Sequence, residues 1–216
     1  TVTALTTLPN GDVVAGGQFT TAGSVAANHI ARWDGTSWSP LGAGMNGVVN
    51  ALTTLANGDL VAGGYFATTG APINIARWDG ASWSALGAGV NSTVYALSTL
   101  PNGDLIAGGG FTMAGPVAAN RIGRWDGTSW SPLGAGINLG VYALSTWPNG
   151  DLVAGGKFTT AGASPASPDP GSKSSWDRWA GCYEHRLKRG YAERRRGPGR
   201  PVQDEVHTAP PSRQCR

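Results

Sequence analysis

Apolar and β-branched runs alternate with turn signals along the first part of the chain. Residues 2–8 form one such run, Pro9-Asn10-Gly11-Asp12 follows, and residues 13–17 form the next run, which ends in two glycines. Proline presets φ, and Asn-Gly accepts the positive φ that a tight turn needs. Two apolar runs on either side of Asn-Gly therefore predict a β-hairpin.

A second hairpin is predicted farther along the same stretch. Residues 20–28 are small and polar and are expected to form a loop, whereas residues 29–33 alternate apolar with polar side chains, the period of a half-buried strand. Asp34-Gly35 then turns the chain, and residues 37–41 run back. The pattern thus predicts four strands, and no window of it shows the spacing of an amphipathic helix.

This unit recurs along the chain. Its opening Val2-Thr3-Ala4-Leu5 has counterparts that begin at Val49, Val94 and Val141, in steps of 47, 45 and 47 residues. Four short strands in a repeat of this length are typical of a propeller blade, because stacked copies bury faces that one small sheet leaves exposed. An open β-solenoid is the alternative, although its repeats are usually shorter.

The sequence therefore predicts an all-β fold built from four-stranded antiparallel β-propeller blades. The repeats span residues 2–48, 49–93, 94–140 and, in part, 141–162. Stacking of the blades is expected to bury Leu5, Phe19, Trp33, Trp38 and their equivalents.

A double glycine followed by two tryptophans marks the repeats. The glycine pairs are Gly16-Gly17, Gly63-Gly64, Gly108-Gly109 and Gly155-Gly156. The tryptophan pairs are Trp33 with Trp38, Trp78 with Trp83, and Trp125 with Trp130. This order resembles the repeats of kelch and galactose-oxidase-like propellers, and it is closest in style to uncharacterised propeller repeats of bacterial surface proteins. The resemblance implies blades and a secreted or cell-surface location, but no kelch function, because Trp stands where kelch repeats favour Tyr.

Aspartate recurs at both turns of the repeat. The first-turn residues are Asp12, Asp59, Asp104 and Asp151, and the second-turn residues are Asp34, Asp79 and Asp126. The second turn is similar to WD repeats and to the sialidase Asp-box, but it lacks the Gly-His partner of the former and the spacing of the latter. An Asx-type turn is favoured. Calcium loops need several oxygen ligands close together, and each turn has one carboxylate, so neither a metal site nor a cofactor is predicted.

The residues beside these turns have structural and functional interpretations. Arg32, Arg77 and Arg124 precede the first tryptophan and are expected to stack on a neighbouring Trp or to pair with a turn aspartate of the next blade. The tryptophan pairs are interpreted as core residues, with sugar stacking in the gaps between blades as the alternative.

No catalytic residue is predicted. His29 is the single histidine of residues 1–162, and its counterparts are Ile73 or Asn74 and Arg121, so no general base with a partner recurs. We expect His29 to be a solvent-facing strand residue. The sequence contains no phosphate loop, nucleophile elbow, signal peptide or transmembrane run.

The repeat pattern ends after Gly162. Residues 163–216 have 11 Lys and Arg against 6 Asp and Glu, whereas residues 1–162 have 5 against 7. Codons compatible with residues 191–203, read one base later, permit the repeat's own Pro-Asn-Gly-Asp-Val-Val-x-Gly-Gly run with one mismatch. We therefore interpret 163–216 as an irregular, out-of-frame tail of a fragment. The alternative is a genuine basic tail that binds nucleic acid or an anionic surface.

The sequence predicts a non-catalytic scaffold that recognises a protein or a glycan without membrane insertion. The loops at 20–28, 67–74 and 112–120 vary most between repeats and are the expected contact regions. Part of a propeller enzyme whose site lies outside this chain is the second hypothesis. Exposed blade edges also favour self-association.

Overall fold

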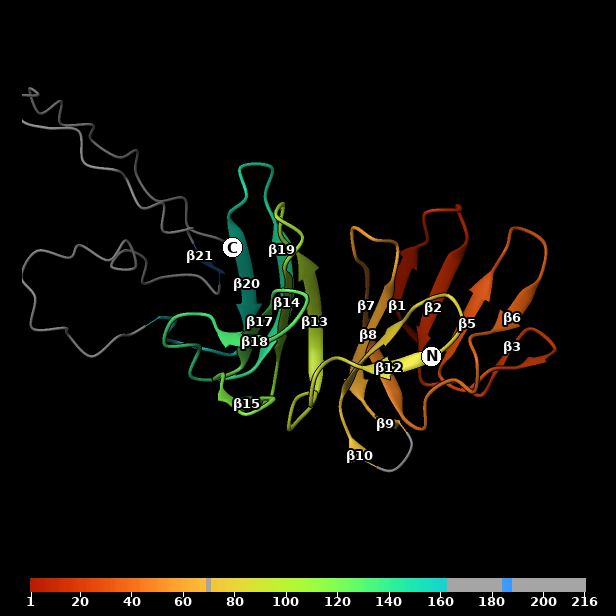
Figure 1. Ribbon diagram of the computed structural model, residues 1–216, viewed down its shortest axis with the longest axis horizontal. Coiled ribbons are helices and arrows are strands. Elements are labelled where there is room, and N and C mark those ends of the chain that lie inside the picture. The colour runs from red at the N-terminus through yellow and green to blue at the C-terminus, as the bar shows by residue number, and fades with distance from the viewer. Residues whose placement is uncertain (69–70, 163–183, 188–216) are drawn as a thin grey trace, which may run out of the picture.

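The computed structural model describes residues 1–68, 71–162 and 184–187, and its regular elements there are β-strands (Figure 1). Each repeat forms one antiparallel sheet whose strands pair in chain order. The first sheet contains β1 (Val2–Thr7), β2 (Val13–Gly17), β5 (Ile30–Trp33) and β6 (Trp38–Pro40). The second contains β7 (Val48–Thr54), β8 (Leu60–Tyr65), β11 (Ile75–Trp78) and β12 (Trp83–Ala85).

The third and fourth repeats follow the same plan. The third sheet contains β13 (Val94–Thr99), β14 (Leu105–Gly109), β17 (Ile122–Trp125) and β18 (Trp130–Pro132). The fourth contains β19 (Val141–Thr146), β20 (Leu152–Gly156) and β21 (Glu184–Leu187). The last of these strands belongs to the tail that the sequence predicted to be irregular. The remaining tail residues, including the arginine cluster, Cys182 and Cys215, lie outside the described part of the chain.

The loop predicted at residues 20–28 contains a short hairpin. β3 (Thr21–Ala22) pairs with β4 (Val25–Ala26), and two further hairpins join β9 (Ala67–Thr68) to β10 (Ala71–Pro72) and β15 (Met113–Ala114) to β16 (Val117–Ala118). Gly23 takes φ +57° and Gly115 takes φ +55° at the corresponding turns. Glycine adopts this left-handed conformation at little cost, so it closes a hairpin too short to show a strand pattern.

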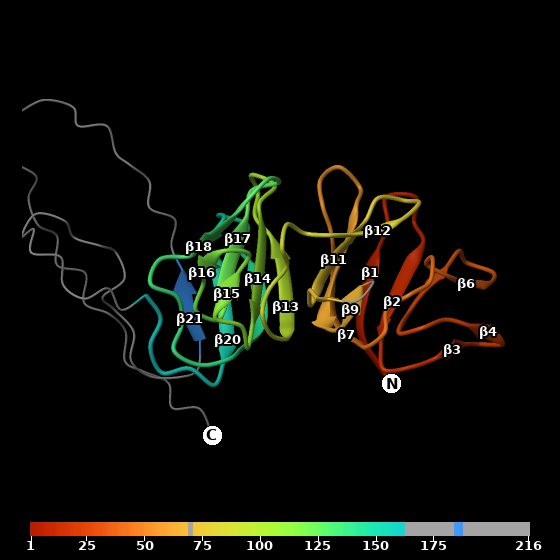
Figure 2. The same ribbon diagram turned by 60° about the horizontal axis from the view of Figure 1, so that its bottom comes forward.

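The four sheets lie side by side in chain order, as Figures 1 and 2 both show. Their first strands, β1, β7, β13 and β19, are neighbours in that order. All of them start at one end of the stack, which we call the loop end because the short hairpins and the linkers between sheets lie there. The opposite end, with both aspartate turns, is the turn end.

The apolar core lies between sheets rather than within one. One cluster joins Val14 and Ile30 of the first sheet to Val49, Leu60 and Phe66 of the second. Equivalent clusters join the second sheet to the third and the third to the fourth. A blade is therefore completed by its neighbours, as expected when each repeat cannot bury its own apolar faces.

The strand predicted to be half-buried is buried on both faces. Ile30 and Ala31 are both fully buried, so the alternation of residues 29–33 does not separate core from solvent. The third sheet shows the cause, because a Cβ on Gly123 would lie 3.4 Å from Trp130 and 3.5 Å from Ala114. The outer tryptophan and the short hairpin thus fold back over their own sheet and cover its second face.

The prediction that Leu5 is buried is wrong. Its side chain is 65% exposed, and Phe19 is half-buried where Phe111 is fully buried. Leu52 and Leu97 pack against the inter-sheet clusters. The difference arises because no described sheet lies against the face of the first sheet that carries Leu5.

The double glycines allow two close approaches. A Cβ on Gly63 would lie 2.5 Å from Val94 Cγ1 of the next sheet. A Cβ on Gly64 would lie 2.0 Å from the carbonyl oxygen of Val48 on its own first strand. The first glycine therefore lets neighbouring sheets pack closely, and the second lets the strand end fold against the start of its blade.

An asparagine after each linker fastens consecutive sheets, and the sequence analysis did not single it out. Asn91 Oδ1 accepts hydrogen bonds from the amides of Thr112 (2.9 Å) and Met113 (3.0 Å), and its Nδ2 donates to Thr112 Oγ1 (3.0 Å). Asn138 makes the same three contacts one repeat later. Its recurrence after Gly-Ala-Gly and one apolar residue was the available signal.

Candidate functional site

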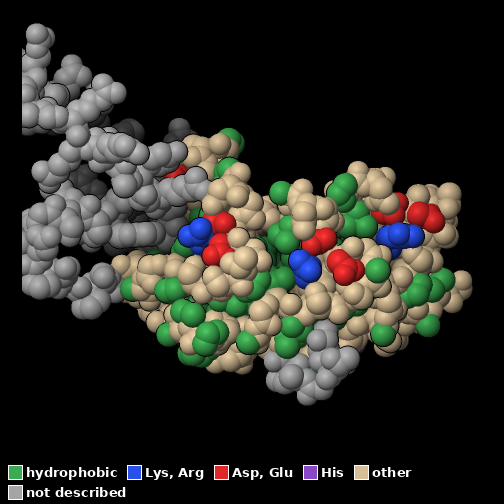
Figure 3. Space-filling view, viewed as in Figure 1, with side chains coloured by type: hydrophobic (Ala, Val, Ile, Leu, Met, Phe, Trp, Pro, Cys, Tyr) green, Lys and Arg blue, Asp and Glu red, His purple; other side chains and the backbone are tan. Residues whose placement is uncertain are grey.

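Charge is divided unevenly between the two ends of the stack. All seven aspartates of residues 1–162 lie in the turns, together with three arginines on the adjoining strands. Of the Lys and Arg residues in 1–162, the other two, Arg121 and Lys157, lie at the loop end. Figure 3 shows the charged side chains in the upper half of the molecule and mainly apolar and uncharged atoms below them.

The arginines beside the tryptophans pair within their own sheet. Arg32 Nε lies 3.4 Å from Asp12 Oδ2, and Arg124 Nε lies 2.6 Å from Asp104 Oδ2. Arg77 pairs with Asp59 in the same way. The predicted partner, an aspartate of the next blade, is wrong, because antiparallel pairing of the second and third strands already places each arginine beside the turn of its own blade.

The second-turn aspartates cap their turns. Asp34 Oδ1 accepts hydrogen bonds from the Thr36 hydroxyl and from the amides of Thr36 and Ser37, each at 2.8 Å. These donors, led by the Thr36 hydroxyl, hold the pKa of Asp34 well below its ordinary value. Asp79 and Asp126 also have lowered pKa values, chiefly because the amides of Ser82 and Ser129 donate to them. All their oxygens face the turn, as in an Asx-type turn.

The tryptophan pairs lie at the contacts between sheets. The rings of Trp78 and Trp83 are 5.3 Å apart between centroids, and Trp83 Nε1 donates to the carbonyl of Leu41 at 2.9 Å. The Trp78 ring lies against Gly42, where a Cβ would be 2.9 Å from Cζ3. Trp130 donates to Leu86 in the next interface. These tryptophans thus hold a blade to the linker of the preceding one.

The residue that precedes the third strand of each of the first three blades has a left-handed backbone conformation. His29 takes φ +64°, Asn74 +52° and Arg121 +64°, which identifies Asn74 rather than Ile73 as the counterpart of His29. The prediction that His29 is a solvent-facing strand residue is wrong, since it precedes the strand and its half-buried ring nitrogen Nδ1 lies 3.1 Å from the Gly17 carbonyl. A carbonyl does not activate histidine as a carboxylate would.

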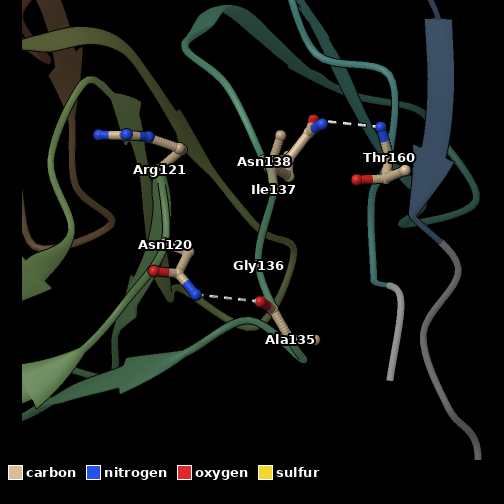
Figure 4. Close-up of a pocket in the computed structure, with 7 residues that line it drawn as sticks. All are labelled: Asn120, Arg121, Ala135, Gly136, Ile137, Asn138 and Thr160. Carbon is tan, nitrogen blue, oxygen red and sulfur yellow. Dashed lines mark hydrogen bonds between the residues drawn. The ribbon is translucent and has the colours of Figure 1, made fainter. Parts of the chain in front are cut away.

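Pockets open at the loop end between sheets. One, of about 240 Å³, lies between the third and fourth sheets and is lined by Asn120, Arg121, Ala135, Gly136, Ile137, Asn138 and Thr160 (Figure 4). The guanidinium of Arg121 points away from Asn138 and Thr160 and donates to the Gly110 carbonyl. The pocket therefore offers side-chain amides and backbone groups to a ligand, while the charged guanidinium of Arg121 points out of it.

A larger pocket of about 670 Å³ overlaps the equivalent place between the first and second sheets and extends along β12 to Ala81 and Ser82 of the second turn. Its walls include Asn28, Asn46 and Met45 from the first repeat and the pair Trp78 and Trp83 from the second. Ligand pockets commonly have this size and combine aromatic walls with a few polar groups. The tryptophans that hold the interface therefore also line an accessible space.

Each first strand contains a β-bulge near its start, and the bulged positions are Thr3, Asn50, Tyr95 and Tyr142. A bulge redirects a side chain. Thr3 Oγ1 donates to the Val49 carbonyl at 2.5 Å, and Asn50 Nδ2 donates to the Val94 carbonyl at 3.2 Å, so both link neighbouring first strands. The two tyrosines take a different arrangement.

Tyr95 and Tyr142 form an exposed aromatic pair at the loop end. Their ring centroids are 5.0 Å apart, and the side chains are 36% and 45% exposed. Tyr65, at the end of β8, and Leu139, two residues before β19, are also exposed at the loop end, at 67% and 47%. The sequence analysis missed the tyrosine pair, although the replacement of Thr3 and Asn50 by tyrosine in the later repeats was a visible signal.

The described part of the chain contains no group of three or more His, Cys, Asp or Glu residues arranged to hold a metal ion. Within the same residues, none of the elements is a helix long and apolar enough to cross a membrane.

Comparison with known proteins supports the architecture. The family model described as the Rax2 C-terminal beta propeller domain matches residues 1–85. These sheets are β-propeller blades. The predicted all-β propeller class is thus confirmed, and the chain is a repeat scaffold. No curated protein sequence matches this chain significantly.

Several solved structures are similar to the chain. The extracellular domain of the putative one component system BT4673 from B. thetaiotaomicron has 12% identity and a TM-score of 0.48, over 73% of this chain and 20% of that one. The WD40 beta propeller domain of Doa1 has 16% identity and a TM-score of 0.48, over 71% of this chain and 47% of that one. Virginiamycin B lyase from Staphylococcus aureus, in a catalytically inactive form, has 20% identity and a TM-score of 0.45, over 71% of this chain and 48% of that one. The chain therefore spans between a fifth and a half of these proteins.

Proposed function

We propose that this chain is a non-catalytic, kelch-like scaffold that recognises a neutral glycan or a protein through its loop end. The observation that carries the proposal is the exposed pair of Tyr95 and Tyr142 at bulged positions, where the first two blades have residues that link strands. An exposed tyrosine presents an apolar ring and a hydroxyl, which suits it to binding surfaces.

A neutral glycan fits this end better than a charged ligand. The polar groups that line the smaller pocket at this end are backbone groups and the side chains of Asn120, Asn138 and Thr160, and Arg121 turns its guanidinium out of it. Sugar hydroxyls hydrogen-bond to amides, and the C–H face of a sugar packs on an aromatic ring. A surface or secreted location would expose the scaffold to such ligands.

The test is binding of the purified chain to immobilised mannan, xylan and β-glucan, and to a protein extract. The double variant Tyr95→Asn/Tyr142→Asn should reduce binding at least about tenfold, because it removes two contact aromatics of a kind that often dominates an interface. Asn is native at the same position of the second blade, so folding should be kept.

Trp147→Leu is the matched control, since Trp147 is 46% exposed at the turn end and the first three repeats have leucine there. It should bind like the wild type. Loss of binding in the control with full binding in the tyrosine variant would contradict the proposed surface. Turnover of a bound glycan by the wild type would contradict the non-catalytic role.

A further inference from the structure

Five asparagines of residues 1–162 are each followed by glycine. Such a pair is chemically labile, because glycine has no Cβ to keep its amide nitrogen away from the side-chain carbonyl carbon of the asparagine. Four of the pairs form the first turns of the blades, and the fifth lies between the first linker and β7. The asparagines of the turns are Asn10, Asn57, Asn102 and Asn149, and the fifth is Asn46.

The turn asparagines are held in an unreactive arrangement. Asn10 Nδ2 donates to Asp12 Oδ2 at 2.8 Å, and Asn10 Oδ1 accepts from the Asp12 amide at 3.2 Å. The amide of Gly11, whose nitrogen would attack, donates to the Leu8 carbonyl at 2.9 Å. The other three turns repeat these contacts. The aspartate charge also opposes the negative charge that attack would place on Oδ1.

Asn46 lacks these restraints. Its exposed side chain accepts a hydrogen bond at Oδ1 from the Ala67 amide at 2.6 Å, a donor that stabilises negative charge on this oxygen. The corresponding Asn91 donates Nδ2 to the Thr112 hydroxyl, but Ala67 stands at that place here and has no hydroxyl. Among the described residues, the Gly47 amide donates to no carbonyl. The attacking nitrogen is therefore not engaged, and no hydroxyl at residue 67 holds the amide that would leave.

We propose that Asn46 is a site of spontaneous modification, at which the side-chain amide becomes a carboxylate. The amide nitrogen of Gly47 loses its proton and bonds to Cγ of Asn46. The bond from Cγ to Nδ2 then breaks, and ammonia leaves after taking up a proton, so that a cyclic imide remains. Water opens the imide at either carbonyl and gives aspartate or isoaspartate. No electron is transferred, and water is the co-reactant.

The product places a negative charge where the loop end has none. All seven aspartates of residues 1–162 lie in the turns, and no glutamate occurs in that range. Asn46 lines the larger pocket, and none of the residues that line it is charged. The modification therefore converts one neutral wall of this pocket into an anionic one. The chemistry belongs to one side chain and does not depend on what the loop end binds.

Incubation of the full chain at mildly alkaline pH, followed by tandem mass spectrometry of its peptides, tests the selectivity. The amide of Asn46 should be lost at least about tenfold faster than that of Asn10, since reaction in the turn must first break hydrogen bonds with a net stabilisation of that order. In urea, where the chain is unfolded, the two should react at similar rates. Equal rates in the folded chain, or a lead of Asn46 that is just as large in urea, would overturn the proposal.

Ala67→Thr tests the contact that distinguishes Asn46 from its counterparts. The variant supplies the hydroxyl that Thr112 and Thr159 supply in the later repeats, so Nδ2 gains an acceptor and the loss of the amide should slow at least about threefold. Ala56→Pro is the matched control, because the other three repeats have proline at this exposed turn position. It should leave the rate at Asn46 unchanged. An unaltered rate in Ala67→Thr, or equal slowing in the control, would show that this contact does not govern the reaction.

Discussion

At the scale of single residues, one carboxylate organises the second turn of each blade. Asp34 accepts three hydrogen bonds at Oδ1 and one from the Ser37 hydroxyl at Oδ2, at 3.0 Å. The ionised form makes all four, which is why its pKa is lowered. In the second blade Ala81 replaces the threonine, and Asp79 loses one hydroxyl donor.

This geometry predicts a stability that depends on pH. A lowered folded pKa stabilises the fold above the unfolded value of 3.8, and the contribution is lost as the pH falls through the folded value. Asp34→Asn should therefore be less stable than the wild type at about pH 7, and the difference should shrink below about pH 4. Urea unfolding followed by tryptophan fluorescence at several pH values measures it.

Asp79→Asn is the internal comparison for this measurement. Its effect should be smaller, because Ala81 supplies an amide but no hydroxyl to the carboxylate. A difference between Asp34→Asn and the wild type that stays constant across the acid range would show that the charge of Asp34 does not stabilise the turn.

At the scale of elements, the outer strand of one blade is fastened to the linker of the blade before it. Trp83→Phe removes the hydrogen bond from Nε1 to the Leu41 carbonyl but keeps an aromatic ring beside Gly42. We expect a loss of about 0.5–1.5 kcal/mol in the free energy of unfolding, the usual net value of one such bond. Chemical denaturation of both proteins at equal concentration gives the value.

Trp38→Phe is the matched variant for the first blade. Trp38 stacks on Trp33 like its counterparts, with centroids 5.3 Å apart, but among the described residues it donates to no linker carbonyl. Its replacement should cost less than that of Trp83. Equal losses would mean that ring packing, and not the inter-blade hydrogen bond, is what Trp83 contributes.

The sequence predicted the strands and the turn chemistry of these elements because both are local. Asn-Gly and Asp-Gly determine the backbone of a turn within a few residues, and Asp34 caps the turn in which it stands. The partner of Arg32 was not predicted correctly, since it depends on which strands pair across the sheet. The short hairpin of residues 21–26 escaped detection because two-residue strands have no measurable period.

At the scale of the whole molecule, identical positions acquire different roles through their place in the stack. The sequence predicted that stacked blades bury their faces. Because the repeats are nearly identical, it did not show in which blade a face stays exposed. Leu5 and Leu52 are the same residue in the same pattern, and only the latter has a preceding blade beside it. Tyr95 and Tyr142 were overlooked for a related reason, because they occupy repeat positions that read as ordinary strand residues.

The first glycine of each pair should differ between blades in how well it tolerates a methyl group, because its neighbours differ with its place in the stack. Gly63→Ala places a methyl group 2.5 Å from Val94 Cγ1, and overpacking of this kind costs about 1–3 kcal/mol. Gly155→Ala adds the same methyl group where the nearest described atom is 3.6 Å away, so the isolated monomer should lose much less. Unfolding of both variants at low protein concentration measures the two costs. The outcome that would contradict this account is a loss of stability in Gly155→Ala equal to that of Gly63→Ala, because it would mean that the face at Gly155 is already covered within the chain.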